Sequence, residues 1–337
     1  MLQPLLQNIA QPDNDSLLGN CVWACSNFCR GKPVPSLGHV APAIPVLAHL
    51  LKNDVDAKQD ALWALSYLSD GNDERIQAVL DTGVVEALME VFAEDSINLT
   101  PALRIVGNIV SGSDTQTQAV IDAGLMSRML SLFHHPKRTI RKEACWVASN
   151  IAAGTHQQIG ALIKTKGLMH RLTEMAETAE WETRKEAVWV LSNIATGGKD
   201  TQVMAMIEVG AIEALCSILD VNDAKMLMVA LDAVDHILKL GMKLNKEYAS
   251  FVDECSGLTL IEALQEHECE DIYDKAVFII ETYFGAEDEV EDENLAPQVE
   301  GGTFSFGIPN AKDVDGDGCP TNSQSNVQPF ATFNFAS

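Results

Sequence analysis

The chain is poor in aromatic and in basic residues. Aromatics make up only 6% of its 337 residues, and 23 lysines and arginines stand against 48 aspartates and glutamates. Because most of its apolar volume comes from Ala, Leu, Ile and Val, stacked helices suit the composition better than a β-sandwich or barrel. A formal charge of −25 repels nucleic acid and anionic lipid and attracts Lys- and Arg-rich partners, although a plain acidic surface is equally compatible with it.

Several kinds of functional segment are also missing from the sequence. No run approaches the roughly 18 apolar residues of a membrane span, and no secretory signal opens the chain. Phosphate-binding loops, nucleophile elbows and catalytic Cys/His pairs are absent, so we predict neither an enzyme nor a cofactor. His134-His135 lacks further ligands, and the calcium-like segment that opens at Asp313 has Gln324 where a glutamate is required. No metal site is therefore predicted.

The eight cysteines do not form a metal-binding pattern. Cys21, Cys25 and Cys29 lie on one face of a predicted helix, but no nearby histidine or second cysteine pair completes a ligand set. We interpret the cysteines as small buried hydrophobic residues in a reducing compartment. The full set is Cys21, Cys25, Cys29, Cys145, Cys216, Cys255, Cys269 and Cys319.

What the chain does contain is an internal repeat. A five-residue phrase recurs, and its first residues lie 40, 41, 42, 43 and 43 positions apart. Two or three helices per unit are typical of repeats of this length, as in armadillo and HEAT proteins. The phrases are Trp23-Ala-Cys-Ser-Asn27, Trp63-Ala-Leu-Ser-Tyr67, Arg104-Ile-Val-Gly-Asn108, Trp146-Val-Ala-Ser-Asn150, Trp189-Val-Leu-Ser-Asn193 and the degraded Asp232-Ala-Val-Asp-His236.

A second phrase, which ends in glycine, keeps the same phase. Its glycines are Gly83, Gly124, Gly167 and Gly210. Glycine there ends one short helix and permits a sharp turn into the next. Each unit is therefore predicted to consist of a short helix, a turn, a second helix, a loop, and a long third helix that carries the Trp/Asn phrase.

The two ends of the chain differ from the repeats. Residues 1–285 are predicted to form the repeat array, with an incomplete first repeat and a two-helix ending at 258–284. Residues 286–337 are acidic and then rich in Gly, Asn and Ser, and we predict a disordered tail. At the other end, we expect Leu2, Leu5, Leu6 and Ile9 to form an exposed apolar face, as a middle helix does when no unit precedes it.

The recurring Trp and Asn residues predict a binding groove. Residues four apart share one helix face, so stacked units align the indoles and the amides in two rows. Each amide offers a donor and an acceptor to an extended backbone, and the indoles can hold Lys or Arg stems. Four carboxylates flank the phrases and would meet the charge of a basic peptide: Asp60, Asp70, Glu143 and Glu186. The alternative is that these residues fill the core, but mid-helix Asn in register argues against it.

At these phrases the chain resembles importin-α (karyopherin-α). The resemblance extends from about Leu5 to Phe306. It implies an all-α, right-handed armadillo-repeat superhelix that begins within the family's fourth repeat. It rests on Trp23-Ala-Cys-Ser-Asn-Phe-Cys-Arg-Gly31, Trp63-Ala-Leu-Ser-Tyr-Leu-Ser-Asp-Gly71, Thr100-Pro-Ala-Leu-Arg-Ile-Val-Gly-Asn-Ile109, Arg141-Lys-Glu-Ala-Cys-Trp146 and Ile280-Glu-Thr-Tyr-Phe-Gly285.

The resemblance also implies which residues contact cargo. The family's minor site for nuclear localisation signals would comprise Arg104, Asn108, Val110, Thr117, Glu143, Trp146, Ser149, Asn150, Glu186, Trp189 and Asn193. A residual part of the major site and a linker would comprise Trp23, Asn27, Asp60, Trp63, Tyr67 and Asp70. The minor site is expected to bind most of the cargo.

The implied function is a nuclear import adaptor in cytoplasm and nucleus. Its partners would be proteins with basic nuclear localisation signals, with the family's export receptor docking on the last repeats. No Lys/Arg-rich arm precedes Trp23, so importin-β engagement is not expected. Two alternatives stay open: an armadillo scaffold of another class, and a regulatory fragment that binds cargo or export receptor without importin-β-dependent import.

Overall fold

The computed structural model describes residues 2–31, 33–52, 57–94, 97–285, 298–300 and 303–305. The chain divides into two units, Met1–Gly285 and Ala286–Ser337. In the described part of the first unit all regular structure is helical. The helices are α1 Leu2–Ala10, α2 Asp15–Cys29, α3 Leu37–Val40, α4 Ala43–Leu51, α5 Lys58–Ser69, α6 Asp73–Leu80, α7 Val84–Val91, α8 Leu99–Val110, α9 Asp114–Asp122, α10 Met126–Phe133, α11 Arg138–Ala152, α12 His156–Lys164, α13 Leu168–Thr178, α14 Trp181–Gly197, α15 Asp200–Ile207, α16 Ala211–Cys216, α17 Ala224–Leu244, α18 Tyr248–Glu254, α19 Gly257–Ala263, the 3₁₀ helix η1 Leu264–Glu266 and α20 Glu270–Tyr283.

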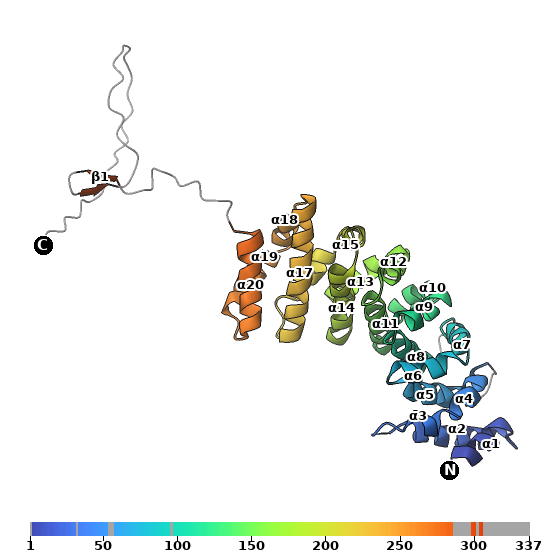
Figure 1. Ribbon diagram of the computed structural model, residues 1–337. Helices are drawn as coiled ribbons and strands as arrows, with labels where there is room; N and C mark the ends of the chain where they lie inside the picture. The colour runs from blue at the N-terminus through green and yellow to red at the C-terminus, as the bar shows by residue number, and fades with distance from the viewer. Residues whose placement is uncertain are drawn as a thin grey trace. The chain divides into compact units, whose positions relative to one another are not determined.

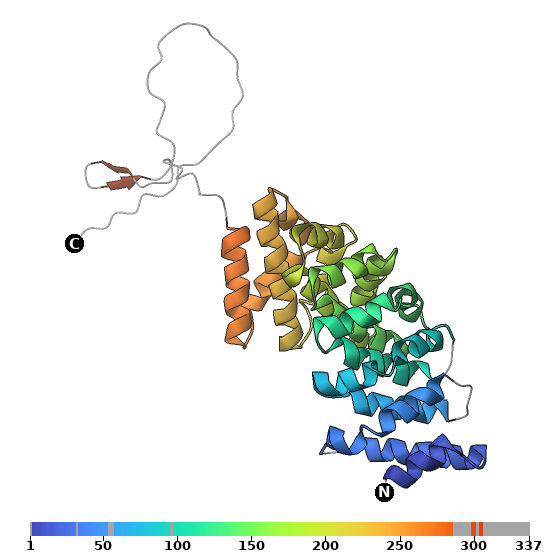
Figure 2. The same cartoon turned by 45° about the vertical axis from the view of Figure 1, so that its right-hand side comes forward.

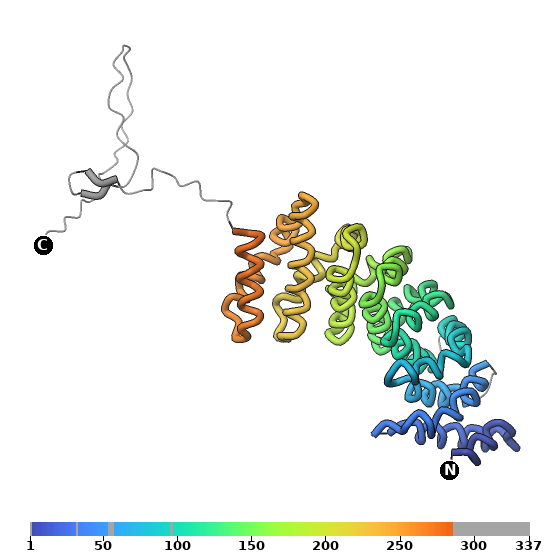
Figure 3. Tube along the Cα trace, viewed as in Figure 1, coloured from blue at the N-terminus to red at the C-terminus, as the bar shows by residue number. Residues whose placement is uncertain are grey.

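The helices of the first unit stack in three parallel rows. The long third helices α2, α5, α8, α11, α14, α17 and α20 each pack on the next, and Figure 1 places them along the inner edge of the curved stack. The Cα trace in Figure 3 passes through the helices in the same order from blue to orange. Figure 2, turned by 45°, shows the shorter helices stacked beside them. The predicted helical-repeat solenoid is confirmed.

Local sequence signals set the turns between these helices. Gly83, Gly167 and Gly210 have φ values of 65°, 78° and 90° and stand directly before α7, α13 and α16. Residues with a Cβ rarely adopt this left-handed conformation, so the recurring glycine permits the sharp helix–helix turn. The predicted role of the glycine phrase is confirmed at these three positions.

A row of polar side chains ties each repeat to the one before it. Gln116 and Gln158 each close a capping box at the start of a helix, and Gln202 accepts from Lys199 N at the start of α15. The side-chain Nε2 atoms of all three glutamines donate to backbone carbonyls one repeat back. The Gln158 bond, to the carbonyl of Asp114, measures 2.8 Å. Arg75 takes the same place earlier in the row and donates to Pro35 O at 2.9 Å. These bonds fix the register between repeats.

The core runs through the whole first unit as one continuous cluster. Cys21, Cys25, Cys29, Cys145 and Cys216 are buried in it as free thiols, as predicted for small hydrophobic residues. Cys255 and Cys269 are half-buried, and Cys319 lies outside the described residues. No helix among the described residues has the length and apolar character needed to cross a bilayer.

The prediction of an exposed N-terminal apolar face is wrong. Ile9 is 3% exposed, and Leu2, Leu5 and Leu6 are half-buried against the core. The reason is that α1 packs against both α2 and α4, so its own repeat and the next one cover that face.

In the second unit the structure describes only two short strands. β1 (Gln298–Glu300) and β2 (Thr303–Ser305) pair antiparallel, with Gln298 opposite Ser305. The sequence analysis did not predict this pairing. The acidic run at residues 287–293 and the calcium-like segment at 313–318 lie outside the described residues.

Candidate peptide-binding groove

The five Trp/Asn phrases lie on five successive third helices. Trp23, Trp63, Arg104, Trp146 and Trp189 sit on α2, α5, α8, α11 and α14, which pack in that order. Trp23 is 60% exposed, whereas Trp63, Trp146 and Trp189 are half-buried. The phrases therefore form a continuous ladder along the inner edge of the solenoid.

The ladder asparagines already use part of their hydrogen-bonding capacity within the chain. Asn193 Nδ2 donates to Ser149 O at 2.9 Å, and Asn108 Nδ2 donates to Ser66 O at 2.9 Å, so both amides join neighbouring repeats. Asn27 donates instead to Trp23 O in its own helix. Since each amide carries two N–H groups and one carbonyl, Asn27 and Asn193 keep groups that can bond to a ligand. Asn108 is buried, and its Nδ2 also donates to Ser69 Oγ at 3.1 Å, so both of its N–H groups are engaged within the chain.

Asn150 differs from the other ladder asparagines. Its Nδ2 atom is buried and has no hydrogen-bond partner within the described part of the chain. A buried donor without a partner loses about 1–3 kcal/mol of hydration free energy. This amide is the least satisfied polar group of the ladder.

The fourth residue of each phrase has a packing role that the sequence analysis missed. Ser26 Oγ and Ser66 Oγ donate to the carbonyls of Trp23 and Trp63 at 2.8 and 2.7 Å, and the hydroxyl of Ser149 does the same to Trp146 O. In α8 the equivalent residue is Gly107. A Cβ there would lie 1.9 Å from Cζ3 of Trp146, so glycine makes room for that indole.

Arg104 occupies the ladder position between two groups of tryptophans. Its Nη2 atom lies 2.7 Å from Glu143 Oε1, and its Cζ lies 5.7 Å from the Trp146 ring centroid. One face of Trp146 is thus in contact with a cation of the chain itself.

At the N-terminal end, Tyr67 replaces the ladder asparagine. Its ring stacks on Trp63 with centroids 6.2 Å apart. A cleft of about 550 Å³ opens beside it, between α2 and α5. The cleft contains two of the predicted linker residues and one from the residual major site, and its lining is Asn27, Cys29, Arg30, Gly31, Val34, Tyr67 and Asp70.

The four predicted carboxylates lie in different electrostatic settings. Burial raises the pKa of Asp60. Burial also raises the pKa of Glu186, although Lys142 opposes this effect. Asp70 is exposed, and Glu143 is engaged with Arg104. Desolvation of Asp60 and Glu186 would be offset by an incoming cation, which makes these two carboxylates receptive to positive charge.

Four predicted minor-site residues are buried rather than lining the ladder surface, and one of them is Asn108, at 7% exposed. Val110 and Thr117 are both 3% exposed, and Thr117 Oγ1 donates to Val110 O at 3.3 Å. Ser149 is 6% exposed. Their direct contact with a ligand remains a prediction.

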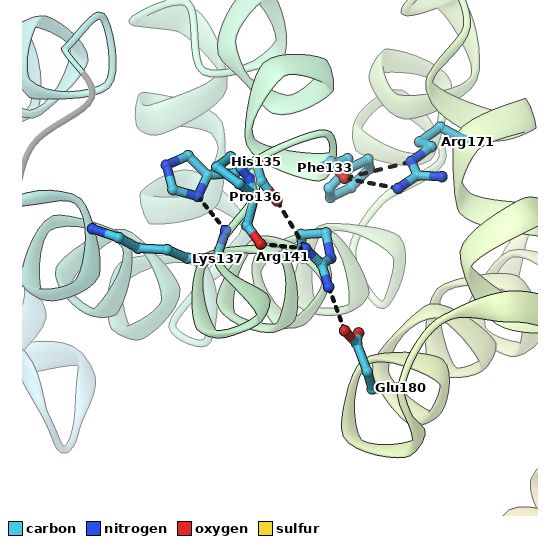
Figure 4. Close-up of polar contacts among 7 residues, drawn as sticks. All are labelled: Phe133, His135, Pro136, Lys137, Arg141, Arg171 and Glu180. Atoms are coloured by element: carbon cyan, nitrogen blue, oxygen red, sulfur yellow. Dashed lines mark hydrogen bonds and ion pairs between the residues drawn. The ribbon is translucent and has the colours of Figure 1, made fainter.

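Arg141 fixes the starts of α11 and α14 relative to one another (Figure 4). Its Nη1 atom donates to the carbonyls of His135 and Pro136, both at 2.9 Å, and its Nη2 lies 2.6 Å from Glu180 Oε1. Glu143 and Trp146 follow Arg141 on α11, and Glu186 and Trp189 follow Glu180 on α14, so this contact links the N-terminal ends of the two helices that carry the candidate site.

The ladder ends in an ion network at its C-terminal side. Lys275 of α20 lies 2.9 Å from Asp232 Oδ1 and 2.8 Å from Asp235 Oδ2, and Tyr283 donates to Asp235 at 2.6 Å. His236, in the asparagine position, contacts the carbonyl of Asp232 through Nδ1. The two carboxylates of the sixth phrase are therefore paired with a lysine of the chain itself, Lys275. Among the described residues, no group of three His, Cys, Asp or Glu side chains is placed to hold a metal ion.

Comparison with known proteins agrees with this architecture. A model of the armadillo/β-catenin-like repeat matches residues 40–70 and 113–153, and a model of the atypical Arm repeat matches residues 246–298. Importin subunit alpha-4 of Arabidopsis thaliana is 47% identical over 299 residues, which cover 86% of this chain and 55% of that protein. The chain is a homologue of the importin-α subunits.

Other relatives support the same assignment of this importin-α homologue. Importin subunit alpha-1a of rice is 42% identical over 91% of the chain, and importin subunit alpha-B of Dictyostelium discoideum is 44% identical over 90%. The chain spans 60% of the length of each.

Solved structures with the same fold include designed proteins. A designed armadillo repeat protein in complex with the peptide (KR)4 superposes with a TM-score of 0.63 at 30% identity, covering 71% of this importin-α homologue and 99% of the designed chain. A second designed armadillo repeat protein gives a TM-score of 0.66 at 26% identity over 70% of the homologue and 99% of the design. The armadillo assignment of the fold thus rests on both sequence and structure.

Proposed function

We propose that the chain is a nuclear import adaptor that binds Lys/Arg-rich nuclear localisation signals as extended peptides along the Trp/Asn ladder. The in-register ladder on five packed helices carries this proposal, because alternate residues of an extended peptide can be met by repeated amides and indoles. The homology to importin-α subunits supplies the transport role. The designed relative bound to (KR)4 supports a basic ligand.

The Trp146–Trp189 half of the ladder is the proposed main site. Its helices α11 and α14 pack on each other and are held at their starts by the Arg141–Glu180 contact. The amide of Asn150 has no partner within the chain, and a turn of its half-buried side chain toward the groove would let it donate to a peptide carbonyl there. Desolvated Glu186 would be stabilised by a cargo cation. Trp23, Trp63 and the cleft beside Tyr67 would extend the track.

A peptide titration tests this function. A labelled Lys/Arg-rich peptide should bind the full chain, and its affinity should fall as salt is raised. Replacing Trp146 and Trp189 together by alanine should weaken binding about fivefold or more, given about 0.5–2 kcal/mol for each cation–π contact. Trp181→Ala is the matched control, since Trp181 is also on α14 but outside the ladder phrases, and it should bind as the parent does.

The outcome separates the proposal from a general scaffold. If basic peptides fail to bind while another extended ligand does, the scaffold alternative is favoured. Unchanged affinity in the Trp146/Trp189 double variant would contradict the main-site assignment. We also propose that the family's export receptor contacts the last repeats, α17–α20, which can be tested by pull-down in the presence and absence of cargo peptide.

A further inference from the structure

Two cations of the chain itself bracket the Trp146–Trp189 pair. Arg104 Cζ lies 5.7 Å from the Trp146 ring centroid, and Lys225 Nζ lies 5.3 Å from the Trp189 ring centroid. Arg104 belongs to α8, which packs on α11, and Lys225 belongs to α17, which packs on α14. In the order α8, α11, α14, α17, the two cations come from the helices on either side of the pair.

Lys225 stands where its helix does not favour a cation. It is the second residue of α17, whose first turn contains no acidic residue and whose N-cap, Asp223, accepts from Met226 N. The partial positive charge at a helix N-terminus repels a lysine there. Within the described residues it forms no ion pair, and the contact it makes is with the Trp189 ring. Its position is thus explained better by the indole than by helix stability.

The N-terminal part of the ladder lacks this arrangement. Among the described residues, no lysine or arginine lies over the rings of Trp23 or Trp63. Trp23 is instead 60% exposed. The bracketing cations are therefore a local feature of the Trp146–Trp189 pair rather than a property of every ladder indole.

A cation on one face of an indole changes what the other face can bind. It covers the π surface on its own side and repels a second cation that would approach that side. We infer that Lys225 is a specificity-determining residue that limits the Trp146–Trp189 pair to one cargo cation, held between the two indoles. This inference rests on the proposed function.

Peptide geometry makes the consequence measurable. Side chains two residues apart in an extended peptide lie on one face, about 6.5–7 Å apart. When one cation sits between the indoles, a second cation two residues away reaches the far side of Trp189. Lys225 Nζ already holds that position. The parent chain should therefore gain little affinity from the second cation.

The test compares two short, capped Gly/Ser peptides. One carries a single arginine, and the other carries two arginines separated by one residue. Fluorescence anisotropy gives the Kd of each peptide for the full chain, and the ratio compared is the Kd of the one-arginine peptide divided by the Kd of the two-arginine peptide. Lys225→Ala and Lys225→Met should raise this ratio on the order of three- to fivefold, because the freed ring face accepts the second arginine. Lys225→Arg keeps the cation and should reproduce the parent ratio.

Lys239→Ala is the matched control for charge. Lys239 is exposed on the same helix and is not among the cations in contact with a ring. It should strengthen binding of both peptides equally, leaving the ratio unchanged. Thermal melts verify that each variant is folded.

Two results would overturn the inference while leaving the proposed function intact. Either the ratio stays at the parent value in Lys225→Ala and Lys225→Met, or it rises equally in Lys239→Ala, so that only long-range charge matters. A different result is expected if the proposed function itself is wrong. The parent chain would then bind neither this peptide pair nor a longer Lys/Arg-rich peptide.

Discussion

At the scale of single residues, Gly107 decides where the Trp146 indole lies. A Cβ at this position would come within 1.9 Å of the ring, so Gly107→Ala must displace Trp146 or the helix. Alanine would gain about 0.5–1 kcal/mol in helix propensity, but overpacking costs about 1–3 kcal/mol. We therefore predict lower stability and weaker binding of basic peptides, measured by chemical denaturation and peptide titration.

Gly19→Ala is the control for helix propensity. Gly19 lies inside α2, and a Cβ added there would meet nothing within 4 Å. The substitution should stabilise the chain by about 0.5–1 kcal/mol. If Gly107→Ala were as stabilising as Gly19→Ala, with unchanged peptide binding, the packing of the Trp146 ring against Gly107 of α8 would be refuted.

The same residues show how far sequence alone can locate the site. The period of the phrases placed Trp146, Trp189 and their asparagines on one face, because spacing on a helix fixes direction. The period could not show that Asn108 and Asn193 bond to the preceding repeat, or that Lys225 lies over Trp189. These contacts depend on how far one helix is shifted along its neighbour, which the pattern leaves undetermined.

At the scale of elements, the glutamine row links consecutive repeats. Gln158 is 1% exposed, accepts from Thr155 N at 2.8 Å and donates to Asp114 O at 2.8 Å. We predict that Gln158→Ala lowers the free energy of unfolding by about 1–3 kcal/mol, because both backbone groups lose a partner. Amide exchange should accelerate at the N-terminal ends of α9 and α12.

The control for this row is a glutamine that bonds only within its own helix. Gln118 donates to Asp122 in α9 at 2.7 Å, and this bond is exposed. Gln118→Ala should change stability by less than about 0.5 kcal/mol. Equal losses for the two variants would contradict a role for Gln158 between repeats.

Element boundaries also show where pattern reasoning succeeded and where it failed. The glycine phrase located the turns before α7, α13 and α16, since only the local conformation had to be known. The N-terminal face was mispredicted because its cover comes from α4, whose packing on α1 is a tertiary contact. The β1–β2 pair was missed because two strands of three residues leave too little pattern to recognise.

At the scale of the whole repeat array, the free energy of unfolding is approximately the sum of the intrinsic stabilities of the repeats and the interaction free energies between neighbouring repeats. The last of these contacts joins α17 to α20 through Lys275, Asp232, Asp235 and Tyr283. Since α20 has a repeat on only one side within Met1–Gly285, it depends on this contact more than an internal helix does. Lys275→Ala should therefore loosen α20 first.

The magnitude and the pH dependence of this effect follow from the same cluster. Burial opposes ionisation of Asp235, but hydrogen bonds from Lys275 and Tyr283 outweigh it and hold the pKa of that carboxyl below its ordinary value. A carboxyl with a lowered folded-state pKa stabilises the fold above its unfolded pKa, near about 3.9, and loses that contribution as pH falls further. After solvent screening, we predict a loss of about 1–2 kcal/mol at neutral pH for Lys275→Ala.

Melting curves of the parent and Lys275→Ala should therefore be furthest apart at neutral pH. They should converge as the pH falls below the pKa of an ordinary aspartate. Lys243→Ala is the matched control, because its ion pair with Asp200 is exposed on both sides, 63% and 46%. That variant should melt within experimental error of the parent at every pH. A Lys275→Ala gap that stayed constant down to the acid limit would show that Lys275 contributes packing of its alkyl chain rather than charge, and the network would then not hold α20 in place electrostatically.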